Sequence, residues 1–292
     1  MPIKESELIL NPDGSIYHLN LKPEHIANTI ILVGDQDRVS KITKHFDTIE
    51  FSIQKREFKT ETGFYKGKRI SIVSTGIGCD NIDIVLNELD ALVNIDFKTR
   101  TLKTHLTTLN IIRVGTSGSL QKEIPVDSFA ISAYGLDFSG MLHFYDIEKI
   151  RHTSFEEAFV KFTKWNINKS QPILVSNSKT LETLFSSEKT KSGVTATASG
   201  FYGPQGRVLR LKTEDPILND RLHDFSFEGL KISNFEMETA AIYGLSALLG
   251  HNALSLNAII ANRATGQFSK NPGALIERLI SYTLDRILDL GN

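Results

Sequence analysis

The sequence predicts an α/β fold, a single domain in which helices cover both faces of a β-sheet. Short apolar segments rich in β-branched residues alternate along the chain with longer segments of helical periodicity. No linker, low-complexity stretch or internal repeat divides the 292 residues, a length that allows one large domain or two small ones. We therefore expect one domain over residues 1–292.

Composition and charge narrow the classes of function. The net charge of −1 gives no overall field that would attract nucleic acid or an anionic membrane. Cys79 is the only cysteine, so an internal disulfide is impossible and a reducing compartment is expected. Residues 1–7 carry charges where a signal peptide would be apolar, and no apolar run is long enough to span a bilayer. We expect a cytoplasmic protein that binds neither nucleic acid nor membranes.

The first predicted unit is a strand over Thr29–Val33, a glycine turn, and a helix over Val39–Phe46. The turn begins at Gly34 and ends at Arg38, close to the start of the helix. An arginine beside open backbone N–H groups at a helix start suits an anion. An ordinary turn with a solvated arginine explains the same residues.

A second unit begins with an alternating strand over Arg69–Thr75, followed by the glycine-rich turn Gly76–Asn81. This turn imitates a dinucleotide-binding fingerprint, but Asn81 occupies the third glycine position, which argues against a Rossmann cofactor site. The segment Ile82–Ile95 has one continuous apolar face and predicts a helix. Phe97–Leu106 is polar and basic without periodicity, which predicts a loop too short to bind nucleic acid.

The segment Asn110–Ser119 is central to the functional interpretation. It begins as an apolar run that predicts a buried strand, and it ends in small residues and glycines that should break the strand. Arg113 lies inside the apolar run, although a guanidinium is rarely buried without a partner. Beside a hydroxyl-rich turn, Arg113 would complete an oxyanion site. A buried structural ion pair is the alternative.

Strands and helices continue to alternate towards the C-terminus. The further predicted strands are Ser128–Tyr134, Pro172–Ser176, Val194–Ser199 and Ala253–Ala261. The further predicted helices are Phe155–Trp165, Ser178–Ser187, Thr239–Leu249 and Gly273–Leu290. The helix over 239–249 consists of small apolar residues and should be buried, whereas the last helix is amphipathic.

Two polar segments interrupt this apolar pattern. Gly200–Arg207 combines turn formers with two aromatic rings, an amide and a guanidinium, which are the groups that a flat heterocycle requires. A turn that packs its own aromatic rings is the alternative. Glu236 and Glu238 precede the helix over 239–249. They would either cap the positive end of this helix or accept hydrogen bonds from the hydroxyls of a polar ligand.

Taken together, these segments resemble the nucleoside phosphorylase family, and within it the uridine phosphorylases. The resemblance covers nearly the whole chain and keeps the order of the family's motifs. The matching segments are Val33–Val39 (VGDQDRV), Arg56–Phe58 (REF), Ser74–Gly78 (STGIG), Ile111–Gly118 (IIRVGTSG), Phe201–Arg207 (FYGPQGR) and Asn234–Thr239 (NFEMET). FYGPQGR is the specific segment, because uridine-directed members hold uracil with a glutamine and an arginine at this spacing.

The resemblance implies a three-layer α/β/α sandwich with a mixed central sheet. It also implies reversible phosphorolysis, in which uridine and inorganic phosphate give uracil and ribose 1-phosphate, with phosphate as co-substrate and no cofactor. The implied phosphate contacts are Gly34, Arg38, Arg113 and Thr116, together with Arg56 from a neighbouring subunit. The implied ribose contacts are Glu236, Met237 and Glu238, together with His18 from a neighbouring subunit. The implied base contacts are Phe201, Gln205 and Arg207.

Shared sites of this kind imply self-association, either as a homodimer or as a hexamer built as a trimer of dimers. The sequence departs from the family at Asn81, where some relatives have a serine that helps to bind a monovalent cation between subunits. The resemblance would place this cation near Glu57 and Ile77, but Asn81 in place of the serine removes one of its implied ligands. The eight histidines show no metal-ligand spacing.

Three alternatives remain open from the sequence. A purine nucleoside phosphorylase of the same fold would lack the pair formed by Gln205 and Arg207. A nucleosidase would use water, and a neutral water needs no cluster of arginines such as Arg38, Arg56 and Arg113. A non-catalytic nucleoside-binding protein would have no reason to keep every phosphate contact.

Overall fold

The computed structural model describes residues 2–291, so Met1 and Asn292 of the predicted domain lie outside the described residues. The strands of the first half are β1 (Thr29–Val33), β2 (Thr48–Lys55), β3 (Phe58–Tyr65), β4 (Lys68–Ser74), β5 (Ile95–Asp96), β6 (Thr101–Leu102) and β7 (Asn110–Ser119). The strands of the second half are β8 (Phe129–Asp137), β9 (Ile173–Ser176), β10 (Thr190–Thr197), β11 (Ser226–Phe227), β12 (Leu230–Glu236), β13 (Asn252–Asn262) and β14 (Gln267–Phe268).

The α-helices alternate with these strands, as predicted. They are α1 (Gln36–Thr43), α2 (Cys79–Asn94), α3 (Thr153–Thr163), α4 (Lys179–Phe185), α5 (Leu218–Asp224), α6 (Thr239–Leu249) and α7 (Pro272–Ile287). Three short 3₁₀ turns are η1 (Pro23–His25), η2 (Met141–Phe144) and η3 (Gly203–Gln205). Within residues 2–291, no helix combines the length and the apolar character that a membrane crossing requires.

A twelve-stranded sheet forms the centre of the molecule. Its main path runs β11-β12-β10-β8-β13-β7-β1-β4-β3-β2, with β14 paired to β13 and β9 paired to β8. β1 is parallel to β4 and β7, and β13 is parallel to β7, whereas β2–β3, β3–β4 and β8–β13 are antiparallel. The mixed central sheet implied by the family resemblance is therefore confirmed.

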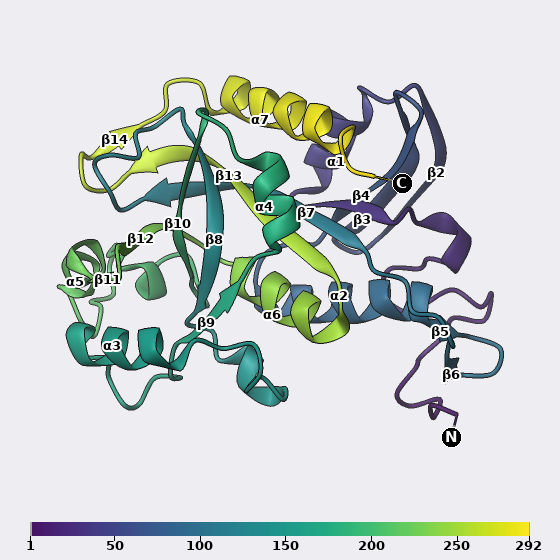
Figure 1. Ribbon diagram of the computed structural model, residues 1–292, viewed down its shortest axis with the longest axis horizontal. Helices are drawn as coiled ribbons and strands as arrows, with labels where there is room; N and C mark the ends of the chain where they lie inside the picture. The colour runs from purple at the N-terminus through teal and green to yellow at the C-terminus, as the bar shows by residue number, and fades with distance from the viewer. Residues whose placement is uncertain (1, 292) are drawn as a thin grey trace.

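Helices cover both faces of this sheet. Along β1, Ile30 and Leu32 pack into one apolar cluster with α2 and α6, whereas Ile31 and Val33 pack into another with α1, α4 and α7. This alternation follows from the period of two in a strand, which sends successive side chains to opposite faces. Figure 1 shows α7 along one face and α2 and α6 along the other. The predicted three-layer arrangement is confirmed.

Several local predictions were wrong. The hairpin β2–β3 was missed, although Ile49, Phe51 and Ile53 alternate with polar residues along β2 as in a half-buried strand. Helix α1 begins at Gln36 rather than Val39, since the carboxylate of Asp35 caps its N-terminus by accepting from the backbone N–H of Asp37. The basic segment 97–106 is not a simple loop, because β5 and β6 form a two-stranded hairpin across it.

The central strand also differs from its prediction. β7 does not break at its glycines but continues to Ser119. The reason is β13, which runs parallel beside β7 up to the pair formed by Asn262 and Ser119 and so satisfies its backbone groups. Small residues therefore continue this strand past Arg113 towards the carboxyl end of the parallel strands, where ligands bind in open α/β sheets.

Candidate active site

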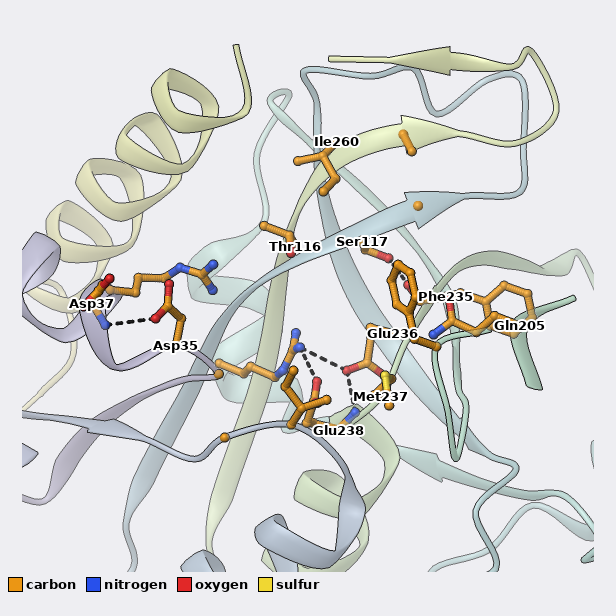
Figure 2. A pocket seen from close by; sticks show the side chains of 18 of the residues that line it. Asp35, Asp37, Thr116, Ser117, Gln205, Phe235, Glu236, Met237, Glu238 and Ile260 are labelled. Atoms are coloured by element: carbon orange, nitrogen blue, oxygen red, sulfur yellow. Dashed lines mark hydrogen bonds and ion pairs between the residues drawn. The ribbon is translucent and has the colours of Figure 1, made fainter. Parts of the chain in front are cut away.

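A cavity of about 740 Å³ opens at the carboxyl ends of β1, β4, β7 and β12 (Figure 2). It brings together most of the residues that the sequence analysis selected. Those that line it are Gly34, Arg38, Arg113, Thr116, Phe201, Gln205, Arg207, Glu236, Met237 and Glu238. His18 and Arg56 are not part of the lining. Residues that are far apart in the sequence thus form one concave site, and the side chains at its two ends differ in chemical character.

One end of the cavity carries two arginines, Arg38 and Arg113. Arg38 lies in the first turn of α1, and its Nη1 donates to the carbonyl of Val114 at 3.3 Å. Burial, and then repulsion by the nearby Arg113, lower the pKa of Arg38. An anion bound between Arg38 and Arg113, next to the hydroxyl of Thr116 and the start of α1, would relieve the repulsion that Arg38 experiences from Arg113.

Arg113 is held by acceptors on two sides although its side chain is only 8% exposed. Its Nη2 donates to Oε2 of Glu238 at 2.5 Å and lies 3.4 Å from Oε2 of Glu236, while its Nη1 donates to Oδ1 of Asn257 at 2.8 Å. Burial opposes the charge, but Glu238 and Glu236 outweigh it and raise the pKa of Arg113. The structural ion pair left open by the sequence is present, and the same guanidinium also lines the cavity.

The two carboxylates at the start of α6 have different surroundings (Figure 2). Oε2 of Glu236 accepts from the backbone N–H groups of Glu238 and Thr239 at 2.9 and 2.8 Å, and Oε1 accepts from the hydroxyl of Thr197 at 2.7 Å. Burial and the neighbouring Glu238 raise the pKa of Glu236, while Arg113 opposes this rise. Glu236 thus caps the helix. Oε1 of Glu238 accepts from the backbone N–H of Gly78 at 2.8 Å, which ties two loops together.

The opposite end of the cavity is built around Gln205, which is 3% exposed. Its Oε1 accepts from Nη1 of Arg207 at 2.6 Å and from Nη2 of Arg263 at 3.1 Å. Two guanidinium donors on one oxygen fix the amide so that its NH₂ group remains the free hydrogen-bonding edge. Arg207 also lies 3.7 Å from the ring centroid of Phe201. Aromatic faces and planar donors therefore converge at this end.

Arg263 is the functional candidate that the sequence analysis missed. It follows β13, its Nη1 donates to the backbone carbonyl of Gln205, and its guanidinium lies 5.1 Å from the ring centroid of Phe235. Burial, and then repulsion by Arg207, lower the pKa of Arg263 to about 10. The available signal was an arginine directly after an apolar strand, at the end of a strand where ligands commonly bind in α/β sheets.

The remaining predicted residues lie at the surface of this chain. His18 precedes β1, and its Nδ1 lies 2.6 Å from Oε1 of Glu88 on α2. Arg56 occupies the turn between β2 and β3 with a φ of 56°, and its carbonyl accepts from Nε2 of Gln36 at 2.7 Å. Because Gln36 lines the cavity, the Arg56 turn is attached to the cavity wall.

The segment considered for a cation lies at the cavity mouth. Glu57 and Ile77 line the cavity. A Cβ atom on Gly76 would lie 2.4 Å from Nδ2 of Asn81 and 3.1 Å from Cγ of Glu57, so both side chains crowd this glycine. Over the described range 2–291, no group of three or more His, Cys, Asp or Glu residues could hold a metal ion.

Comparisons with known proteins identify the family of this chain. A model of the phosphorylase superfamily matches residues 28–280. The uridine phosphorylase of Thermococcus kodakarensis is 30% identical, over 88% of this chain and 81% of that protein. A DeoD-type purine nucleoside phosphorylase of a Thermoanaerobacter species is 26% identical, over 86% of this chain and 89% of that protein.

Solved structures of related proteins also match this chain. A Trypanosoma brucei nucleoside phosphorylase, described as showing uridine phosphorylase activity, superposes with a TM-score of 0.87 at 27% identity and covers 97% of this chain and 100% of that chain. A structure from a study of two uridine phosphorylases of Phytophthora capsici has a TM-score of 0.70 at 22% identity, with full coverage of both chains, and supports the fold alone.

Proposed function

Because the chain belongs to the phosphorylase superfamily, we propose that it is a uridine phosphorylase, a pentosyltransferase that reversibly converts uridine and phosphate into uracil and ribose 1-phosphate. One observation carries the choice of base. Gln205 is buried between Arg207 and Arg263 and faces the same cavity as Arg38 and Arg113. Fixed donors of this kind match the carbonyl oxygens of uracil.

The proposed chemistry uses the two ends of the cavity together. Breaking the glycosidic bond builds positive charge on the ribose and negative charge on the departing base. Phosphate, held by Gly34, Arg38, Arg113 and Thr116, is the nucleophile and also balances the charge of the oxocarbenium-like sugar. Arg207 and Gln205 donate to the uracil oxygens as the base leaves. A pair of proton-shuttling carboxylates, as glycosidases use, is not required.

The sugar is expected to lie between these ends. Met237 and Glu238 line the cavity together with the arginines and with Phe201, Gln205 and Arg207, which we call the base cluster. Glu238 is proposed to accept hydrogen bonds from the ribose hydroxyls. Glu236 already accepts three hydrogen bonds, two from backbone N–H groups and one from the hydroxyl of Thr197. We propose that it supports the ribose site mainly by fixing the start of α6.

The proposal extends to the assembly of the protein. His18 and Arg56 lie outside the lining of their own cavity, which suits residues that complete the site of a neighbour. The proposed assembly is a homodimer, alone or within a hexamer formed as a trimer of dimers. The chain is proposed to form one domain over 1–292, and the single Cys79 suits a reducing, cytoplasmic setting.

The deciding experiment follows the ultraviolet absorbance of uridine with and without phosphate, with inosine assayed in parallel. We expect loss of uridine only when phosphate is present, and no change in inosine. Cleavage of inosine would transfer the protein to the purine-specific branch, and cleavage of uridine without phosphate would make it a nucleosidase. Binding of uridine in equilibrium dialysis without any turnover would identify a nucleoside-binding protein.

A further inference from the structure

The side chain of Arg113 lies in a slot formed by two neighbouring strands. β7 and β13 are parallel, and their register pairs Ser255 with Arg113 and Asn257 with Gly115. Residues two apart on a strand share a face, so Arg113 and Gly115 face the same side of the sheet. A Cβ atom on Gly115 would lie 1.9 Å from Nη1 of Arg113. The guanidinium therefore occupies the space that any side chain at position 115 would fill.

Asn257 closes this slot from the adjacent strand. It is fully buried, and its Oδ1 accepts from Nη1 of Arg113 at 2.8 Å. Its Nδ2 donates to the hydroxyl oxygens of Ser132 at 3.3 Å and Ser255 at 3.4 Å. These two acceptors fix the orientation of the amide, so the oxygen must face Arg113. A buried amide with both ends engaged is a rigid support rather than a space filler.

The side chain of Asn257 is uncharged, which affects how strongly the cavity attracts an anion. Glu236 and Glu238 already place two carboxylates next to Arg113. A third acceptor with negative charge would reduce the attraction that the cavity offers to an anion, whereas an amide oxygen holds the guanidinium without adding charge. With Nη2 held by Glu238 and one hydrogen of Nη1 held by Asn257, the remaining N–H groups are the ones available to a ligand in the cavity.

We propose that Asn257 is a positioning residue that sets phosphate affinity by aiming the guanidinium of Arg113 into the cavity. The inference rests on the proposed function to the extent that the anion is the phosphate co-substrate. Asn257 lies behind the cavity wall and is not one of its lining residues. Its effect should therefore reach phosphate only through Arg113.

The test replaces Asn257 with leucine, which has a similar size but no acceptor. Without this hydrogen bond the buried guanidinium of Arg113 should lose its fixed orientation, so we expect the KM for phosphate to rise about tenfold. The KM for uridine should stay within about twofold, because the base cluster is untouched. Asn252→Leu is the matched control, since Asn252 is the same residue type at the other end of β13, where it donates to Asn110.

A second variant keeps the test decisive if Asn257→Leu does not fold. Asn257→Asp preserves the shape and an acceptor oxygen but adds a charge, so it should also raise the KM for phosphate and leave the KM for uridine unchanged. In a folded variant, an unchanged KM for phosphate would overturn the proposal. So would an equal rise in both KM values, because a purely structural role would loosen the whole site.

A binding measurement separates this inference from the proposed function. Inorganic phosphate alone should raise the unfolding temperature of the wild-type protein, and this shift should be lost or much reduced in Asn257→Leu. If uridine is not cleaved but the phosphate shift still depends on Asn257, the proposed function fails and the inference holds. If phosphate produces the same shift in both proteins, the inference is wrong.

Discussion

At the base end of the cavity, three side chains fix one another. Gln205 accepts from both Arg207 and Arg263, and Arg207 also donates to the carbonyl of Phe201 at 2.6 Å. Removing one arginine leaves the other in place on the amide oxygen. Arg207, the proposed donor to the base, can therefore be removed while Gln205 stays in place, so a mutation can test its role without disturbing the fold.

We predict that Arg207→Ala lowers the turnover of uridine by about 10²–10³, the usual cost of removing one preorganised donor. The unfolding temperature should change little, because Arg263 continues to hold Gln205. Arg210→Ala is the matched control, since Arg210 is an exposed arginine in the same segment. Turnover close to that of the wild type would remove Arg207 from the mechanism.

At the scale of single elements, strand ends carry the unusual chemistry. Asp137 ends β8 as a buried residue. Its Oδ1 accepts from the backbone N–H and the hydroxyl of Ser139 at 2.8 and 2.6 Å, whereas its Oδ2 is buried and has no hydrogen-bond partner among residues 2–291. Burial raises the pKa of Asp137, although the bonds from Ser139 oppose this rise.

The raised pKa of Asp137 predicts a pH-dependent effect on stability. A carboxyl whose pKa is higher in the folded than in the unfolded state lowers the free energy of unfolding at neutral pH. This destabilisation shrinks once the pH falls below the folded-state pKa and is absent below the unfolded-state pKa. Asp137→Asn should therefore raise the unfolding temperature relative to the wild type at pH 7.5 by more than at pH 4.5. Thermal unfolding at both pH values checks this, and a difference that is the same at both would contradict it.

The success of sequence analysis differed between elements for physical reasons. The bounds of β1 and α6 were predicted correctly because a short β-branched run and a small apolar helix are strong local signals. The extent of β7 depends on β13, which is distant in the sequence, so local residues could not predict it. Arg263 was missed because its partner Gln205 lies on a separate loop. The cavity motifs were recognisable because each is a compact segment.

At the scale of the whole molecule, we propose that each site is shared between two subunits. Arg207 belongs to a chain's own cavity, whereas Arg56 is proposed to serve the neighbour. A mixed dimer of Arg207→Ala and Arg56→Ala subunits then contains one site with both defects and one site with neither. Two nearly inactive proteins should therefore restore activity when they are combined.

We predict that coexpression of these two variants gives about one quarter of wild-type activity, because half of randomly paired dimers are mixed and each has one intact site. The specific activity of the unfractionated mixture measures this, and mixed dimers isolated with two different affinity tags should have about one half of wild-type activity. Each variant alone serves as the control. Verified mixed dimers without recovered activity would show that Arg56 acts within its own chain.

The pairing of β7 also governs how the chain is made. β7 pairs with β1, which precedes it, and with β13, whose first residue Asn252 is 142 positions after Asn110. During synthesis, β7 leaves the ribosome long before β13 exists, so one edge of an apolar strand stays unpaired and prone to aggregation. Contacts so distant also form slowly. Asn257, one of the acceptors that hold Arg113, arrives with this strand, so a nascent chain closes the open edge of β7 and fixes Arg113 in the same step.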